Sequence, residues 1–540
     1  MRLSADAEFL GTGNRDPGFD LSWPRRPPRR FPRSHISLVL VVVGLVAVSW
    51  LGRDTAAVTG RVVFDKTGLP VAGARVGARG SNERVQTGAD GRFRLRSAAP
   101  SSSRIVASKP GHFIAGMPHV GGVRVRLKKY PTEQSPDYEW LDPGPDPAGA
   151  ENCANCHAEI YRQWSASSHA RSAVNRHFLD VFYGTDWTGR PNVGWNFSRD
   201  HPEARAVCVA CHVPTIAADS SIADDPARAT GVVREGIHCD LCHKIAGADD
   251  SAIGLQHGRD ALRLVKPAGG VQVFFGPLDD VDRGRDVYSP LYKSSLYCAS
   301  CHEGTLFGTR AYETFSEWRA SDYARRGVEC QDCHMKPDGT TRRIATGAGA
   351  IDRDPASIST HHFAASIDES FLRSSVEIDV DARREKECVR ATITVRPKNV
   401  GHCLPTGSPD RHLVLVVRAT DAAGAELRQT SGLTIGSEGG VGSLAAGNLS
   451  GQPGTIFGKL LRGPAGESPA PFWRAVAVEK DSRLRPDEPA ELQFTFDRSS
   501  DGPVRLSVSL IYRRFYKLTA AEKGWPDSDV TLAERSIQLP

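Results

Sequence analysis

Hydrophobic and polar positions alternate in two stretches of the chain, near residues 55–130 and near residues 366–540. In the first stretch the segments VTGRVVF, GRFRLR and VRVRLKK alternate, and turn sequences such as DKTG and PGH separate them. In the second stretch SVEIDVD, VRATITVRP and VRLSVSLIYRRF alternate in the same way. A period of two residues between turn clusters is typical of antiparallel strands with one buried face. We therefore predict two β-sandwiches, the second of immunoglobulin-like type.

The stretch between the two predicted sandwiches has little hydrophobic periodicity. Residues 131–150 are rich in proline and predict a linker, and residues 151–365 predict a separate domain of loops and short helices. The chain has 52 glycines and 35 prolines, which agrees with short elements. The predicted domains are thus 1–53, 55–130, 131–150, 151–365 and 366–540.

The N-terminal segment 1–53 combines an arginine-rich arm with an apolar run. Residues 36–51 (ISLVLVVVGLVAVSWL) carry no charge and follow the segment RRPPRRFPR. An uncleaved signal anchor, which is a transmembrane helix, is one interpretation, and a signal peptide with a long basic region is the other. We favour the anchor because no clear cleavage site follows the run. The positive-inside rule then predicts a single-pass protein of the cytoplasmic membrane, with most of the chain on the periplasmic side.

The charge of the chain excludes one class of partner. The formal net charge is +5, and the basic residues are scattered among acidic ones. Nucleic-acid binding is therefore not expected.

Ten of the twelve cysteines belong to five C-x-x-C-H motifs, CANCH, CVACH, CDLCH, CASCH and CQDCH. Their cysteines are Cys153, Cys156, Cys208, Cys211, Cys239, Cys242, Cys298, Cys301, Cys330 and Cys333, and the histidines that follow are His157, His212, His243, His302 and His334.

This spacing is typical of covalent attachment of c-type haem. Two cysteines three residues apart form thioethers with one haem edge, and the next residue then lies under the iron as its proximal ligand. A zinc ribbon does not require histidine after every second cysteine, and a thioredoxin-like redox site occurs once rather than five times. We predict five c-type haems. Because attachment takes place outside the cytoplasm, this agrees with the predicted topology.

The sixth ligands of the haem irons are predicted to be histidines. The chain has three methionines. Met1 lies in the arm, Met117 in the first sandwich, and Met335 directly follows a proximal histidine. Histidine ligation favours low reduction potentials.

The first predicted sandwich resembles the carboxypeptidase regulatory-like domains in the segments TGRVVFDKTGLPVAGARV, TGADGRFRL and VASKPGHF. The resemblance implies a transthyretin-like fold. Such a domain would serve as a stalk or would recognise a partner or a surface glycan, and we favour the stalk.

The motif region resembles the multihaem cytochromes of the hydroxylamine oxidoreductase group and the tetrahaem cytochromes of nitrifiers. The resemblance rests on CANCHAEIYRQWSASSHA, EGIHCDLCHK and YETFSEWRASDYARRGVECQDCHM. It implies distal ligands at His169, His238, His361, His362 and His402. Other histidines remain as alternatives, namely His177, His201, His257 and His412. Tyr323 stands where relatives have a histidine, which leaves one sixth ligand open and allows for a five-coordinate haem.

The sequence predicts a membrane-anchored electron carrier that relays electrons between extracytoplasmic redox proteins. The alternative is an oxidoreductase that acts on a small nitrogen or sulfur compound at a five-coordinate haem. The related pentahaem nitrite reductases carry C-x-x-C-K at the active haem, and this chain has no such motif. Direct oxidation of quinol is not expected, because a sandwich and a linker separate the anchor from the first motif. The oligomeric state stays open.

Cys388 and Cys403 lie outside the motifs and close together in sequence. A structural disulfide is the favoured interpretation in an oxidising compartment, and two free thiols are the alternative.

Overall fold

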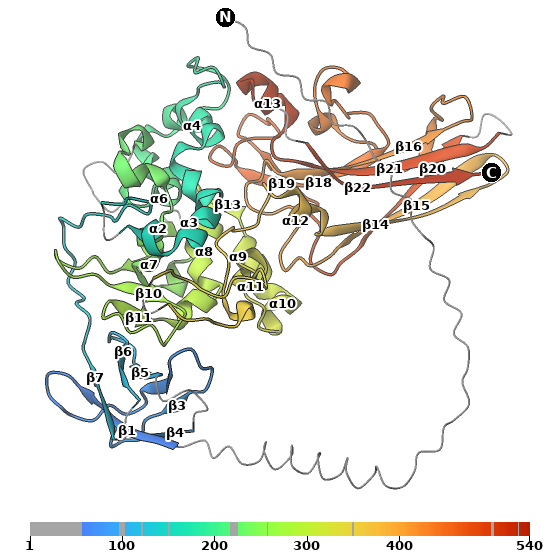
Figure 1. The fold of residues 1–540 in the computed structure, drawn as a ribbon. Helices are drawn as coiled ribbons and strands as arrows, with labels where there is room; N and C mark the ends of the chain where they lie inside the picture. Colours follow the sequence, from blue (N-terminus) through green and yellow to red (C-terminus); the bar gives the residue numbers. More distant parts are fainter. Residues whose placement is uncertain are drawn as a thin grey trace, which may run out of the picture. The chain divides into compact units, whose positions relative to one another are not determined.

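The computed structural model describes residues 57–96, 103–119, 122–148, 152–216, 225–255, 258–347, 350–497, 502–526 and 529–540 (Figure 1). The predicted membrane anchor over 36–51 lies outside these residues. Within them, no helix has both the length and the apolar character needed to span a bilayer. As a description of these residues, the predicted fold class is therefore wrong in including a transmembrane helix, because their α-helices have only four to eight residues.

The first sandwich consists of two small sheets. Their strands are β1 (Ala57–Phe64), β2 (Arg75–Ala78), β3 (Val85–Gln86), β4 (Arg92–Arg96), β5 (Arg104–Ser108), β6 (Ala115–Pro118) and β7 (Val123–Leu127). One sheet has the order β4-β1-β7 and the other β3-β2-β5-β6. Alternate residues of β4 and β7 point inward, and Val62, Val76 and Val125 are fully buried between the sheets. The two-residue period in the sequence thus corresponds to one buried and one solvent face.

Residues 131–148 form no helix or strand and lie along the motif region. The backbone N–H of Ser135 donates to the carbonyl of Lys266, and the hydroxyl of Tyr138 donates to the Asp240 carboxylate at 2.7 Å. The segment therefore packs on the domain that follows it, with contacts at two separate points.

The motif region, residues 152–365, is built from short helices and two-stranded sheets. Its helices are α2 (Cys153–Cys156), α3 (Ala158–Ser165), α4 (Arg176–Tyr183), α5 (Phe197–Asp200), α6 (Ala206–His212), α7 (Cys239–His243), α8 (Leu296–His302), α9 (Thr314–Ala320), α10 (Asp322–Arg325) and α11 (Cys330–His334). Its strands are β8 (Ile245–Ala248), β9 (Leu262–Leu264), β10 (Phe274–Gly276), β11 (Asp286–Tyr288), β12 (Gly304–Leu306) and β13 (Thr309–Tyr312).

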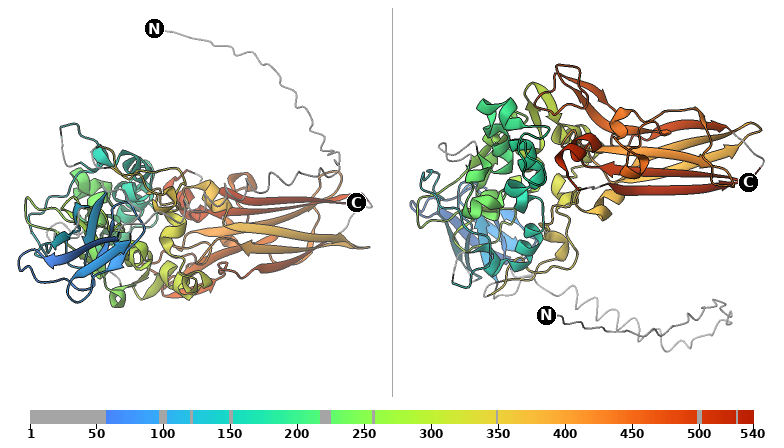
Figure 2. Two further views of the ribbon diagram at one scale, coloured as in Figure 1. Left: turned by 60° about the horizontal axis from the view of Figure 1, so that its bottom comes forward. Right: turned by 90° about the horizontal axis from the view of Figure 1, so that it is seen from above.

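The second sandwich follows the short helix α12 (Glu369–Arg373) and has longer strands (Figure 2). These are β14 (Val376–Arg384), β15 (Cys388–Pro397), β16 (His412–Thr420), β17 (Gln429–Ser431), β18 (Gly454–Arg462), β19 (Ala477–Asp481), β20 (Ala490–Asp497), β21 (Val504–Arg513) and β22 (Val530–Leu539), with helix α13 (Lys517–Lys523) before the last strand.

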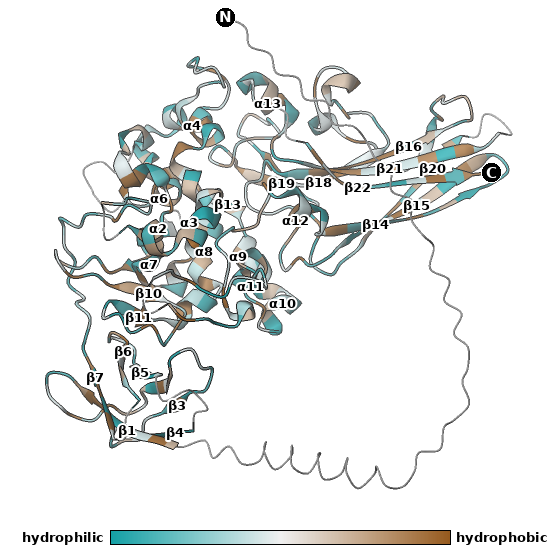
Figure 3. Cartoon of the chain, in the orientation of Figure 1, coloured by the Kyte–Doolittle hydropathy of each residue, from teal (hydrophilic) through white to brown (hydrophobic). Residues whose placement is uncertain are grey.

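The strand order of the second sandwich is antiparallel throughout. One sheet is β14-β15-β20-β17 and the other β19-β18-β16-β21-β22. The orders β14-β15-β20 and β22-β21-β16-β18-β19 are those of strands A-B-E and G-F-C-C′-C″ in variable-type immunoglobulin domains. Ile393, Leu415 and Phe494 are fully buried between the sheets. Figure 3 shows the hydrophobic and hydrophilic bands that alternate along these strands.

Candidate haem-binding site

Each of the five C-x-x-C-H motifs forms a single helical turn. The turns are α2, the end of α6, α7, the end of α8, and α11. Residues three apart lie on the same face of a helix, so the two thiols of a motif point to one side. In the first motif the helix ends at Cys156, and His157 joins α2 to α3. The predicted one-turn geometry is therefore present at every motif.

Four of the five proximal histidines contact a backbone carbonyl through Nδ1. The Nδ1 atoms of His157, His243 and His334 lie 2.6, 2.6 and 2.5 Å from the carbonyl oxygens of Ile344, Phe275 and Ala364. His212 has a longer contact of 3.4 Å to Ser172. A carbonyl can only accept, so Nδ1 carries the hydrogen and Nε2 keeps a free lone pair. Ligating histidines typically have this arrangement, and the residues therefore fit haem iron.

Burial favours the neutral form of several histidines in the motif region. It lowers the pKa of His212 and of His169 to about 4, and that of His302 to about 3, where nearby histidines add to the effect. A metal binds the neutral imidazole, because the ligating nitrogen must be unprotonated.

Two of the predicted distal ligands face a proximal histidine from another part of the chain. The ring centroids of His169 and His302 are 6.3 Å apart, and those of His402 and His334 are 6.2 Å apart with nearly parallel planes. A metal bonded at about 2.0 Å to one nitrogen of each ring would separate the centroids by about 6 Å. Both pairs therefore have the spacing of two axial ligands.

Two further candidates have a buried nitrogen without a partner. His238 is fully buried; its Nδ1 accepts from the backbone of Leu241, and its Nε2 has no partner. His361 has an unpartnered Nδ1, whereas the neighbouring His362 is exposed. Only His361 of this pair therefore turns into the domain.

The alternative histidines differ from one another. Both ring nitrogens of His201 have contacts, to Glu203 and to the Trp473 carbonyl, and His177 stacks on Phe515. His257 lies outside the described residues. His412 on β16 is fully buried with an unpartnered Nε2, although no motif marks it. His112 in the first sandwich has the same pattern, so an unpartnered nitrogen alone does not identify a ligand.

Comparisons with known proteins agree with this geometry. The carboxypeptidase regulatory-like domain matches residues 57–115, and the family "Cytochrome c554 and c-prime" matches residues 152–244. A penta-heme cytochrome c552 from Thermochromatium tepidum is 23% identical, with a TM-score of 0.52, and the match covers 72% of this chain and 97% of that chain. The chain is a multihaem cytochrome with an N-terminal carboxypeptidase regulatory-like domain. The two matches support c-type haem as its cofactor.

Two other results add no argument about this cytochrome. The Fcho1 Mu homology domain of Danio rerio, solved with a bound Eps15 peptide, matches at 11% identity and a TM-score of 0.12, over 31% of this chain and 50% of that chain. No curated protein matches the chain.

Cysteines of different motifs lie side by side in the cytochrome. Three pairs of thiols, Cys153 with Cys239, Cys211 with Cys301, and Cys298 with Cys330, lie close enough for each thiol to shift the pKa of its neighbour, in opposite directions within a pair. Cys242 and Cys298 are also close enough for their charges to interact. The fourth motif therefore neighbours the second, the third and the fifth, and the first neighbours the third.

A buried ion pair joins Asp240 inside the third motif to Lys244 directly after it, and no prediction from the sequence included this pair. The ammonium of Lys244 lies 2.7 Å from the Asp240 carboxylate, and both side chains are fully buried. Tyr138 donates to the same carboxylate, and Asp240 together with burial raises the pKa of this phenol. The i,i+4 spacing of Asp240 and Lys244 on one helical face is the signal that could have revealed the pair.

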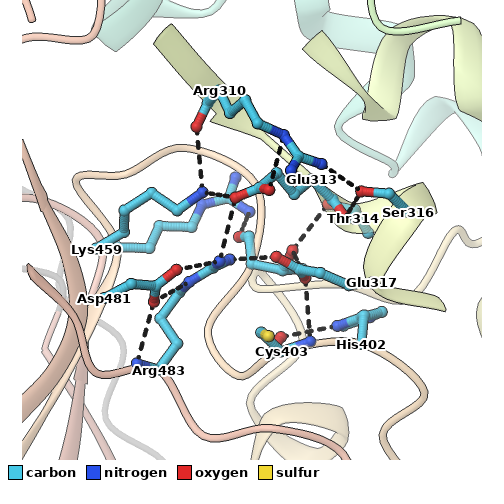
Figure 4. Close-up of polar contacts among 12 residues, drawn as sticks. Arg310, Glu313, Thr314, Ser316, Glu317, His402, Cys403, Lys459, Asp481 and Arg483 are labelled. Carbon is cyan, nitrogen blue, oxygen red and sulfur yellow. Dashed lines mark hydrogen bonds and ion pairs between the residues drawn. The ribbon is translucent and has the colours of Figure 1, made fainter. Parts of the chain in front are cut away.

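The loop that carries His402 is held by a polar cluster between α9 and the second sandwich (Figure 4). Glu317 on α9 accepts from the backbone N–H of Cys403 at 3.0 Å and from Thr406 at 3.1 Å, and forms an ion pair of 2.6 Å with Arg483. Arg483 also pairs with Asp481, and Lys459 pairs with Glu313. We call these residues the Glu317 cluster. Arg483 and Lys459 are only 6% and 2% exposed, so water screens the cluster poorly.

Tyr323 lies beside the same loop. A Cβ at Gly401 would be 3.2 Å from the Cβ of Tyr323, so this tyrosine touches the backbone next to His402. The tyrosine at the position where the resemblance implies a histidine therefore lies next to the loop that carries His402.

Cys388 and Cys403 form no disulfide, and the favoured prediction is wrong. Both are free thiols, and the Cys388 thiol donates to Glu385 at 3.3 Å. Cys388 begins β15 and Cys403 follows its end, and ten extended residues span about 30 Å. Although the two cysteines are close in sequence, the strand between them therefore holds them apart, near its opposite ends.

Proposed function

We propose that the cytochrome binds five c-type haems, one at each motif, and relays electrons between redox proteins outside the cytoplasm. When bound, a haem supplies an iron that accepts and releases one electron. The residues of this chain attach the haems through thioethers, hold the proximal imidazoles by their Nδ1–H bonds, and exclude water from the rings.

The observation that carries the proposal is the adjacency of the motifs. Because thiols of four pairs of motifs approach each other, haems attached to them would form a connected series rather than five separate sites. The series branches at the fourth motif. A connected series suits transfer of electrons through the domain.

We further propose His169 as the distal ligand opposite His302, and His402 as the one opposite His334. The ring spacings of 6.3 and 6.2 Å support both pairs. His238 and His361 are the next candidates, because the resemblance implies both and each also keeps a buried unpartnered nitrogen. Histidine on both sides of an iron favours low potential and a low-spin state.

The haem count is tested by the intact mass and the haemochrome absorbance of protein secreted from a host with the attachment machinery. Wild type should carry five haems, and replacing both cysteines of one motif by alanine, such as C153A/C156A, should remove one. C388S is the matched control and should keep all five. Wild-type protein with fewer than five haems would contradict the count.

Electron relay is tested by redox titration of the purified protein with the spin states recorded. Reversible reduction of every haem without turnover of nitrite or hydroxylamine supports the relay. Turnover of either compound would instead favour the enzymatic alternative.

A further inference from the structure

Six exposed arginines cover one side of the first sandwich. They lie on the outer face of the sheet β4-β1-β7, and we call them the arginine face: Arg61, Arg92, Arg94, Arg96, Arg124 and Arg126. Their positions alternate with the buried residues of β4 and β7, so each arginine points away from the core.

The register of the sheet places three of these arginines in one row. Arg61 in the central strand is directly opposite Arg92 on one side and Arg124 on the other. Like charges directly opposite each other on neighbouring strands destabilise a sheet. The row therefore costs stability in the isolated protein.

The described residues near the face neutralise little of its charge. The carboxylate of Asp90 lies 3.5 Å from the guanidinium of Arg92. The backbone carbonyl of Asp90 accepts a hydrogen bond from Arg61. The side chains of the other four arginines form no hydrogen bond or ion pair with any residue that the structure describes. Arg94 and Arg96 also line a surface hollow of about 550 Å³ beside β4.

Arginines on or beside the second sheet of the same domain form ion pairs with carboxylates. Asp279 pairs with Arg75 at 3.0 Å and with Arg84 at 2.6 Å. Asp282 pairs with Arg104 at 2.6 Å. Both aspartates come from the segment 277–286 of the motif region, so a peptide with closely spaced carboxylates binds arginines of this domain.

We propose that the arginine face is a docking surface for an acidic protein that presents closely spaced carboxylates. Arginine binds carboxylates with a planar fork of donors, and complementary charge both orients a partner and speeds its association. A lipid surface is the less suitable occupant, because the outward positions of β4, β1 and β7 carry arginines and small residues rather than the aromatic and large apolar side chains that insert into a membrane.

The proposal is tested with poly-L-glutamate as the probe and the full-length protein immobilised through its C-terminus. The triple variant R61Q/R92Q/R124Q removes the row of opposed charges. At low ionic strength we expect it to bind poly-L-glutamate at least tenfold more weakly than wild type, and the difference should shrink as salt is added. The matched control is R162Q/R325Q/R428Q, which removes three exposed arginines elsewhere and should change binding less than twofold.

Two outcomes would overturn the proposal. An equal loss in the two triple variants would mean that only net charge matters. Unchanged binding of poly-L-glutamate, with loss of binding to vesicles containing one quarter phosphatidylglycerol, would assign the face to a lipid surface.

A second measurement addresses folding of the variant. Because R61Q/R92Q/R124Q relieves repulsion, its first sandwich should resist thermal unfolding at least as well as wild type at low salt, and a marked loss would contradict the energetic argument. Neither measurement depends on the haem count, so the docking proposal can fail while the proposed electron relay stands.

Discussion

At the scale of single residues, the histidines of this cytochrome differ in what their ring nitrogens contact. His201 has a partner at both nitrogens, whereas His238 and His361 each keep a buried nitrogen without one. An unsatisfied buried polar atom costs about 1–3 kcal/mol. That cost disappears if the nitrogen binds a metal, so these side chains fit a holoprotein better than the bare polypeptide.

Replacing His402 by alanine tests its role as an axial ligand. The ring lies 6.2 Å from that of His334, and its Nδ1 contacts the carbonyl of Cys403, which leaves Nε2 free. We expect H402A to convert one haem to a high-spin state in electron paramagnetic resonance and leave the other haems unchanged. H201A is the control and should leave every signal in place, and an entirely low-spin H402A would exclude this ligand.

Lys523 shows a residue-scale contact that stabilises the fold. Its ammonium is fully buried and donates to carbonyls of the motif region, among them those of Asp180, Thr185 and Trp195 at 3.0, 3.0 and 2.7 Å. K523M leaves these carbonyls unpaired, and we expect a loss of about 3 kcal/mol, seen as a lower midpoint in calorimetry. K398M removes a lysine whose side chain is 52% exposed and should shift the midpoint far less. Equal shifts would refute the prediction.

The proximal ligands could be predicted from sequence because each lies within five residues of its cysteines. The histidines that face these ligands could not be predicted from sequence alone, because the pairs His169–His302 and His334–His402 join residues 133 and 68 positions apart. No local pattern encodes such a contact. The family resemblance suggested which histidines to consider, and the fold determines which of them meet.

At the scale of elements, strands were easier to predict than helices. Strands such as β4 and β15 alternate buried and less buried residues, so their period is visible in the sequence. The helices of the motif region have four to eight residues, which is too short for a helical period, and only the cysteine motifs mark them. The error at Cys388 and Cys403 has the same origin, because spacing was considered without the intervening strand.

The Glu317 cluster links one helix to the loop of His402, and we expect it to position that ligand. E317Q replaces a buried acceptor of two donors and removes the ion pair with Arg483. The resonance signal or potential of one haem should then change, while the other haems keep theirs. R483K should disturb that haem less than R483M, because lysine retains the charge.

R353M is the matched control for the Glu317 cluster. Arg353 is 9% exposed and pairs at 2.8 Å with Asp280, which is 1% exposed, so its loss also breaks a buried ion pair. Breaking such a pair costs about 3–5 kcal/mol. R353M should lower the unfolding temperature without changing any haem signal. If H402A alters one haem and E317Q does not, His402 is a ligand, and the prediction that Glu317 positions it is wrong.

At the scale of the whole molecule, the first sandwich is attached to the motif region by charge. Asp279 and Asp282 are 10% and 3% exposed and pair with arginines on or beside the second sheet. The resemblance to carboxypeptidase regulatory-like domains favours a stalk over recognition of a partner or a surface glycan, and that choice stays a prediction. Contacts between residues about 200 positions apart make this domain part of the same compact unit as the rest of the described chain.

The double variant D279N/D282N tests whether these pairs hold the sandwich in place. Each amide keeps the shape of the carboxylate but loses the attraction to Arg84 and Arg104; the two carboxylates are only 10% and 3% exposed, so salt screens these pairs less than fully exposed ones. We expect a larger radius of gyration in small-angle scattering and faster cleavage within residues 131–150, because the segment loses the support of a docked domain. D352N breaks an exposed ion pair with Arg343 and should change neither quantity. Unchanged scattering in D279N/D282N would mean that apolar contacts, such as Phe113 with Phe275 in a shared cluster, suffice to hold the domain.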